Sequence, residues 1–126
     1  MQHDSFFERF DAVIQSPKRF VLACHVNPDG DAIGSVLAMA EFLKRKGHSV
    51  KMVVANDFHE FLHWMPCADD FLVFEKDADA CKDAIADAEC IMMLDFNNFR
   101  EAASYITKLG RRVALVFWST IIATPT

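Results

Sequence analysis

The residues best suited to chemistry in this sequence lie in the segment 25–35, which reads His-Val-Asn-Pro-Asp-Gly-Asp-Ala-Ile-Gly-Ser. It places one imidazole and two carboxylates close together, those of His25, Asp29 and Asp31. A further carboxylate, Asp95, follows a later apolar run. One imidazole with several carboxylates suits Mn²⁺ or Mg²⁺ better than a structural Zn²⁺ site. Two such ions can activate water and stabilise both oxygens of a phosphoryl displacement, so the pattern predicts metal-dependent hydrolysis of phosphate esters.

The backbone around these residues carries its own prediction. Asn27-Pro28 is expected to keep the chain extended after a strand, and Gly30 is expected to permit a tight turn. Asp29 and Asp31 would then both face one pocket. A helix that begins directly after the loop adds partial positive charge, which favours carboxylates and a phosphate at the same place.

Each residue taken alone also has an ordinary structural interpretation. Either Asp29 or Asp31 can be only the N-cap of the helix, and Gly30 only a turn residue. A single histidine such as His25 is more often a satisfied side chain than a ligand, and Asp95 can simply begin a loop. The combination His-x-x-x-Asp-x-Asp at one strand–helix junction, with a second strand-end aspartate, favours the metal site.

The elements that must position these residues alternate between strand and helix patterns. Apolar runs of strand length predict strands at residues 19–24, 49–55, 71–74, 90–95 and 112–118. Helical spacing of apolar residues predicts helices at 3–16, 31–46, 77–88 and 102–109, with a short one at 58–64. This alternation predicts a three-layer α/β/α domain with a mostly parallel sheet. Ligands of such sheets bind beyond the carboxyl ends of the strands, where both polar clusters fall.

Composition excludes several other classes of protein. The chain has 126 residues, of which 52% are hydrophobic and 25% charged, as expected for one globular domain. A net charge of −5 argues against a face that binds duplex nucleic acid, although a short nucleotide-like substrate held through metal ions is compatible with it. Residues 1–10 lack the basic start and apolar run of a secretory signal, and no stretch is long enough to cross a bilayer, so we expect neither feature. Four scattered cysteines without a C-x-x-C pair favour a reducing compartment, so we expect a cytoplasmic protein. No sequence pattern indicates the oligomeric state.

Residues 25–35 resemble the first motif of the DHH family of phosphoesterases. The resemblance is to the subgroup with a DHH and a DHHA1 domain, which includes bacterial oligoribonuclease (nano-RNase) and 3′-phosphoadenosine 5′-phosphate phosphatases. Residues 92–99, Met-Met-Leu-Asp-Phe-Asn-Asn-Phe, are similar to the second motif, and the resemblance runs from residue 3 to residue 110. It implies Mn²⁺-dependent hydrolysis of short oligoribonucleotides or 3′,5′-bisphosphorylated nucleosides. It also implies four metal ligands, whose activated water attacks phosphorus: His25, Asp29, Asp31 and Asp95.

The sequence departs from the family in two ways. The Asp-His-His motif that names the family is absent, because no histidine follows Asp95. The DHHA1 domain, which in the family closes over the substrate, is missing as well, so residues 1–126 are expected to form a partial DHH domain. Two functions therefore stay open: a Mn²⁺-dependent phosphoesterase, and an inactive truncated fragment that at most binds metal or nucleotide.

The C-terminal segment offers a reason for the missing motif. With plausible codons, residues 118–123 can be written TGG TCG ACC ATC ATC GCT, and reading from the third base gives GTC GAC CAT CAT, which encodes Val-Asp-His-His. The hidden motif lies where the family's Asp-His-His motif is due, and this position favours the hypothesis of a frameshift affecting residues 113–126. Chance is the alternative, because codon degeneracy allows many shifted readings, and the nucleotide sequence of this region distinguishes the two.

Overall fold

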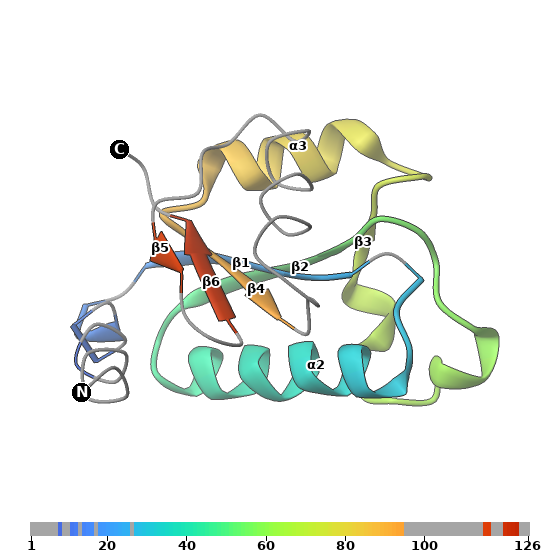
Figure 1. The fold of residues 1–126 in the computed structure, drawn as a ribbon, viewed down its shortest axis with the longest axis horizontal. Coiled ribbons are helices and arrows are strands. Elements are labelled where there is room, and N and C mark those ends of the chain that lie inside the picture. Colours follow the sequence, from blue (N-terminus) through green and yellow to red (C-terminus); the bar gives the residue numbers. More distant parts are fainter. Residues whose placement is uncertain are drawn as a thin grey trace.

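The computed structural model describes residues 8, 11–12, 14–16, 18–25, 27–94, 115–116 and 120–123. Within these residues six strands form one sheet in the order β3-β2-β1-β4-β6-β5 (Figure 1). The strands are β1 (Arg19–Cys24), β2 (Ser49–Val54), β3 (Leu72–Val73), β4 (Cys90–Leu94), β5 (Leu115–Val116) and β6 (Thr120–Ala123). The first four are parallel to one another, whereas β6 is antiparallel to both β4 and β5.

Helix α2 (Gly30–Arg45) crosses from β1 to β2 and is defined at both ends by its sequence. Asp29 is its N-cap, and its carboxylate accepts a hydrogen bond from the backbone N–H of Ala32. At the other end Gly47 has a φ of +92°, a conformation that glycine adopts without strain. The N–H of Gly47 donates to Lys44 and that of His48 to Leu43, which is the pairing of a Schellman C-cap.

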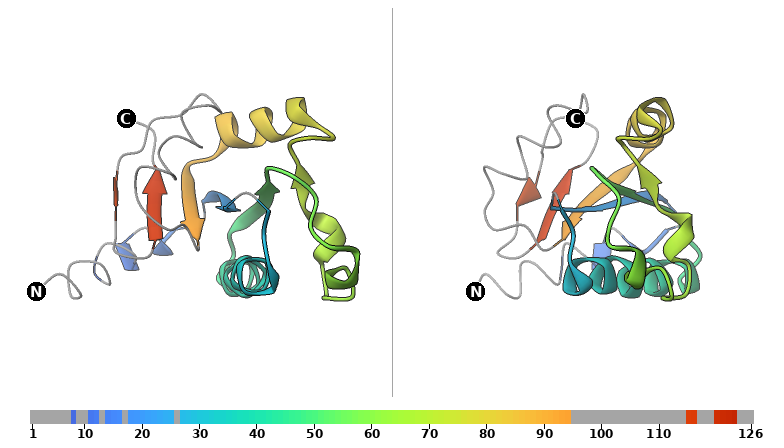
Figure 2. Two further views of the ribbon diagram at one scale, coloured as in Figure 1. Left: turned by 45° about the vertical axis from the view of Figure 1, so that its right-hand side comes forward. Right: turned by 90° about the vertical axis from the view of Figure 1, so that its right-hand side faces the viewer.

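Helix α3 (Ala78–Asp87) lies on the other face of the sheet, before β4. Asp77 caps it by accepting the N–H of Ala80, at 3.2 Å. Two short 3₁₀ helices, η1 (Glu60–Leu62) and η2 (Ala68–Asp70), lie between β2 and β3. In Figures 1 and 2 the sheet lies between α2 and α3, which makes three layers.

The two faces of β1 bury alternate side chains against the two helices. Phe20, Leu22 and Cys24 join the core that contains the buried face of α2, whereas Val21 and Ala23 join the core that contains α3. All five are at most 2% exposed. Continuous burial on both faces is expected for a central parallel strand and explains why this run lacks polar residues.

Most predicted elements are confirmed within a residue or two, including the three-layer α/β/α class. Two predictions were wrong in extent. The 58–64 segment forms only the 3₁₀ turn η1, because its bonds join Leu62 to His59 and His63 to Glu60, with i→i+3 spacing. The strand predicted at 71–74 is only β3. Of the last strand predicted at 112–118, the described residues 115–116 form β5, and β6 is a further strand that was not predicted. Of the helix predicted at 3–16, the described residues 8, 11, 12 and 14 are helical, and the 102–109 segment lies outside the described residues.

Among the described residues, no helix combines the length and the apolar character needed to span a membrane.

Replacing Leu22 with alanine tests the central position of β1. Leu22 is 0% exposed, so its truncation should lower the free energy of unfolding by about 2–5 kcal/mol. Urea denaturation measures the change. Lys51→Ala, at an exposed position of the neighbouring strand β2, should change stability by less than about 0.5 kcal/mol; equal effects of the two substitutions would contradict the described core.

The four cysteines test burial independently, because no disulfide joins them and Cys67 alone is exposed. Burial raises the pKa of Cys81 to about 11, so at pH 8 it carries almost no reactive thiolate. Iodoacetamide followed by peptide mass spectrometry should label Cys67 first in the folded chain and all four cysteines after denaturation. Early labelling of Cys24, Cys81 or Cys90 would be inconsistent with this packing.

Candidate functional site

The strand order creates a switch point at the carboxyl end of β1. The chain runs from β1 outward to β2 and β3, then returns to place β4 on the opposite side of β1. α2 and α3 therefore cover opposite faces, and in such sheets the crevice outside the two diverging strands is the usual ligand site. His25 follows β1 directly, and Leu94, the last residue of β4, is paired with Cys24. The two predicted ligand segments thus leave the sheet from adjacent positions; Asp95 itself lies outside the described residues.

His25 and Asp29 are brought together at this end of the sheet. Nε2 of His25 lies 3.9 Å from Oδ1 of Asp29, and the His25 side chain is 21% exposed. A divalent ion bonds to such atoms at about 2.1 Å, so one ion can contact both. The same Asp29 oxygen accepts the N–H of Ala32 at 2.9 Å. The N-cap interpretation of Asp29 is therefore confirmed, and it leaves further carboxylate lone pairs for a metal.

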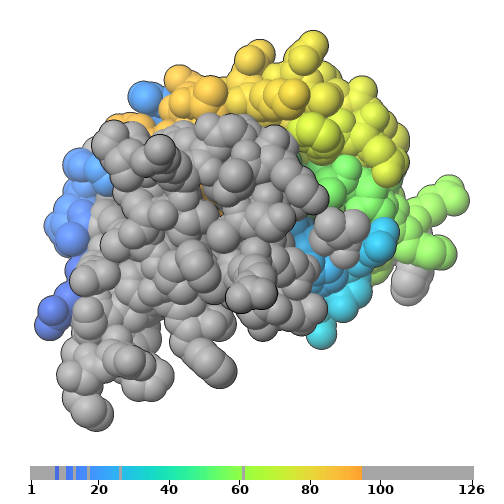
Figure 3. Space-filling view, turned by 45° about the horizontal axis from the view of Figure 1, so that its top comes forward, coloured from blue at the N-terminus to red at the C-terminus, as the bar shows by residue number. Residues whose placement is uncertain are grey.

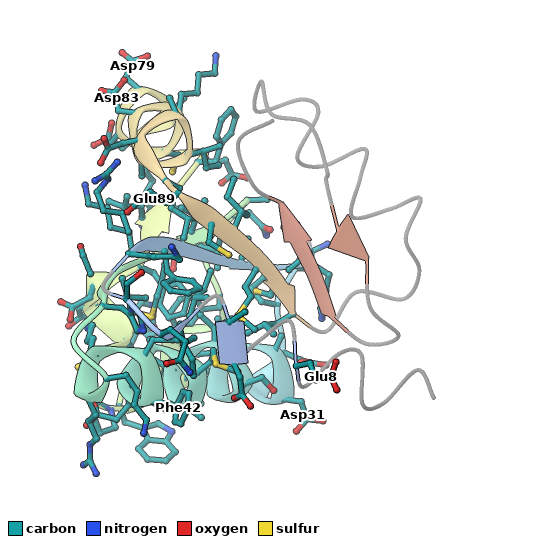
Figure 4. The ribbon with its side chains drawn as sticks, turned by 90° about the vertical axis from the view of Figure 1, so that its left-hand side faces the viewer. Glu8, Asp31, Phe42, Asp79, Asp83 and Glu89 are labelled. Atoms are coloured by element: carbon teal, nitrogen blue, oxygen red, sulfur yellow. The ribbon has the colours of Figure 1, made fainter. Side chains whose placement is uncertain are left out.

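Asp31 is not brought into the same group. It is exposed in the first turn of α2, and Figure 4 shows it projecting from the start of that helix away from the strands. Within the described ranges no three histidine, cysteine, aspartate or glutamate side chains gather closely enough to hold a metal. The structure therefore juxtaposes two of the four predicted ligands, and their chemistry, an imidazole beside a carboxylate, fits a divalent ion.

The predicted backbone of this loop was wrong in one respect. The sharp turn lies at Asn27, whose φ is +55°, rather than at Gly30. Gly30 begins α2 in an ordinary conformation, and a Cβ there would meet only Leu62 Cδ2, at 3.8 Å. Asparagine adopts the left-handed conformation more readily than most residues do. Here two hydrogen bonds between Asn27 and Asn56, one donated by each residue, also hold the turn, so it depends on a residue far away in the sequence.

Asn56 was missed by sequence reasoning although a signal existed. It lies just after β2, at the same edge of the sheet as the residues that follow β1. The rule that singled out His25 and Asp95, that polar residues directly after parallel strands gather at one edge, applies equally to Asn56 and Asp57.

The comparisons with known proteins agree with this fold. The model of the DHH family, N-terminal domain, matches residues 19–116. The chain belongs to the DHH family. Its DHH domain is similar to the crystal structure of an exopolyphosphatase-related protein from Bacteroides fragilis, with 34% sequence identity and a TM-score of 0.73. That similarity covers 78% of this chain and 29% of the Bacteroides protein, so the chain spans less than a third of its length. No functionally curated protein matched the chain.

A second polar cluster of the DHH domain lies beside Asn56. Oδ1 of Asp57 lies 3.3 Å from Nε2 of His63, whose Nδ1 lies 3.0 Å from Oδ1 of Asp69. Lys76 donates to Asp57 at 2.6 Å, and the Phe58 ring stacks on His63 with centroids 4.3 Å apart. These contacts connect residues of the segment between β2 and β3 to one another and to Lys76, which follows β3.

Charge pairing shifts the titration of this cluster. The hydrogen bond to Asp69, with a further contribution from Asp57, raises the pKa of His63. The hydrogen bond from Lys76 lowers the pKa of Asp57, and the same bond raises the pKa of Lys76. His63 is thus held more readily as an imidazolium between two carboxylates.

The cluster predicts a pH-dependent effect of His63→Gln. Because the folded-state pKa of His63 is raised above 6.5, its stabilisation is complete below that value and is lost as pH rises through the folded-state pKa. The stability difference between wild type and His63→Gln should be larger at pH 6 than at pH 9, as measured by urea denaturation. Asp70→Asn, which changes an exposed neighbouring carboxylate, should leave that pH dependence intact. A difference that stays constant from pH 6 to pH 9 would show that the imidazolium is not held by the two carboxylates.

Proposed function

We propose that this DHH domain carries the metal-binding part of a phosphoesterase that hydrolyses phosphate esters with divalent ions. The observation that carries the proposal is the pairing of His25 with Asp29 at 3.9 Å, at the switch point of the sheet. The ions would be held by four side chains: His25, Asp29, Asp31 and Asp95. When bound, they would supply activation of water and neutralisation of the phosphate charge.

The chain's own residues contribute orientation and charge. The N–H of Ala32 holds the Asp29 carboxylate in place, so this ligand is oriented before a metal arrives. The amino end of α2 adds partial positive charge beside it, which favours both carboxylate and phosphate. Asp31 is exposed, so packing does not fix its rotamer, and reorientation of its side chain is fast.

We propose Mn²⁺ as the metal, with Mg²⁺ as the alternative. The donor set contains an imidazole nitrogen together with carboxylate oxygens. Imidazole suits transition metals, whereas Mg²⁺ prefers oxygen ligands and keeps much of its water. The mixed donor set therefore favours Mn²⁺.

The substrates we propose are short oligoribonucleotides or 3′,5′-bisphosphorylated nucleosides, and we propose the cytoplasm as the compartment. The resemblance to the DHH/DHHA1 subgroup supports these substrates. The Bacteroides protein is described as exopolyphosphatase-related, which supports a phosphate-bearing substrate in general. A net charge of −5 favours a small substrate held through metal ions over a long duplex. The absence of a disulfide among the four cysteines is compatible with a reducing compartment.

The second candidate is a partial DHH domain that binds metal or nucleotide without turnover. Two observations favour it. The family match ends at residue 116, and β6, in the segment where the frameshift hypothesis places the hidden motif, pairs antiparallel with β4. No histidine lies in that segment to contribute to a metal site.

A hydrolysis assay with single-residue variants tests the proposal. The chain is incubated with Mn²⁺ and either a diribonucleotide or 3′-phosphoadenosine 5′-phosphate, and product is measured. Loss of a residue that only hydrogen-bonds to a metal ligand lowers activity by about 10–100-fold. Asp31→Ala and Asp95→Ala remove proposed ligands themselves, so each should lower Mn²⁺-stimulated activity by more than that. Asp79→Ala removes a carboxylate from α3, on the opposite side of the sheet (Figure 4), and should change nothing.

The outcomes separate the two candidates. Activity that survives both Asp31→Ala and Asp95→Ala would refute the proposed ligands. Mn²⁺ binding in a calorimetric titration without any turnover would support the non-catalytic domain instead.

A further inference from the structure

The side chain of Asn56 joins two connections that are separate in the sequence. Its Oδ1 accepts the backbone N–H of Asn27 at 2.9 Å, and its Nδ2 donates to Oδ1 of Asn27 at 2.7 Å. A longer contact, 3.5 Å, runs from Nδ2 to the carbonyl of Asp57. The first two bonds, here called the Asn27–Asn56 clamp, tie the loop after β1 to the loop after β2.

The polarity of the clamp follows from its backbone partner. A backbone N–H can only donate, so the atom of Asn56 that faces it must be the oxygen. The amide nitrogen then faces the Asn27 side chain, which must present an acceptor. Alanine or leucine at position 56 would supply neither atom. An amide is therefore the group that satisfies both partners in the observed arrangement.

The clamp acts on the strained point of the loop. Asn27 lies two residues after His25 and two residues before Asp29, and its φ of +55° is unfavourable for most L-residues. Asn56 holds both the backbone and the side chain of this residue. Figure 3 shows the light-blue to cyan surface at the start of α2 adjoining the green surface of the segment that follows β2, as the clamp requires.

We infer that Asn56 is a positioning residue for the candidate metal site. By holding Asn27 in the left-handed conformation, it sets the spacing between His25 and Asp29 before any ion binds. The inference rests on the proposed function, because it assumes that these two residues are ligands. Asn56 bonds to Asn27, which lies between the two ligands in the sequence, so its effect passes through Asn27.

Three variants of the whole chain test the inference. Asn56→Ala removes both bonds of the clamp. Asn27→Asp keeps them, because an acceptor oxygen remains at the same place and aspartate tolerates the left-handed conformation. Asp77→Ala is matched for stability: it removes the side-chain cap of α3, on the other face of the sheet, and leaves the loop untouched.

Two measurements are made on each variant. Calorimetric titration with Mn²⁺ gives the affinity, and hydrogen exchange without metal gives the protection of the Asn27 amide. We expect Asn56→Ala to weaken Mn²⁺ binding by about 10–100-fold, the range found for residues that orient metal ligands, and to speed exchange at Asn27. Asn27→Asp should not weaken binding, and Asp77→Ala should change neither quantity.

The outcomes separate this inference from the proposal beneath it. A wild-type chain that binds no Mn²⁺ refutes the proposed metal site in this chain, and with it the positioning of metal ligands by Asn56. If the wild-type chain binds Mn²⁺ and Asn56→Ala binds it equally tightly, only the positioning role is refuted. Equal weakening by Asp77→Ala would also refute that role, by assigning the effect to general stability.

Discussion

Parallel pairing on both sides of β1 is the constraint on which the rest of this domain depends. Because β1 bonds to β2 on one side and β4 on the other, both its neighbours must be reached by crossovers rather than hairpins. Those crossovers place α2 on one face and α3 on the other, so β1 is buried on both faces and contains no polar residue after Arg19. The two crossovers diverge at its carboxyl end, and His25 lies there.

The chemistry of that end depends on how the loop after β1 is held. Asp29 has two roles at once, as the cap of α2 and as the partner of His25, so helix formation and ligand placement depend on the same carboxylate. The left-handed Asn27 between them is held from the neighbouring loop. The loop between β1 and α2 is thus held at Asp29 by the amino end of α2 and at Asn27 by the loop after β2. Binding loops are commonly positioned by a rigid scaffold in this way.

The sequence was informative wherever local patterns decide structure. The apolar run 19–24 and the helical patterns at 31–46 and 77–88 are local signals, and their elements formed within a residue of where they were expected. The left-handed Asn27 could not be predicted in the same way, because its partner Asn56 lies 29 residues away. The His63 cluster was missed for a similar reason, since Lys76 and Asp57 meet only after β3 pairs with β2. The extra strand β6 was missed because the last predicted strand ended at residue 118 and none was predicted after it. For the site, His25 and Asp29 were placed together, Asp31 was not, and Asp95 stays a prediction.

Paramagnetic broadening of backbone amide signals tests the central claim most directly, that an ion binds at the carboxyl ends of β1 and β4. Mn²⁺ is added in substoichiometric steps to the isotopically labelled chain, and the loss of each signal is followed. The account predicts that signals of residues 25–31 and of the residue after Leu94 disappear first. Earlier loss at the exposed carboxylates of α3, Asp79, Asp83 and Asp87, or uniform loss over the whole surface, would contradict it.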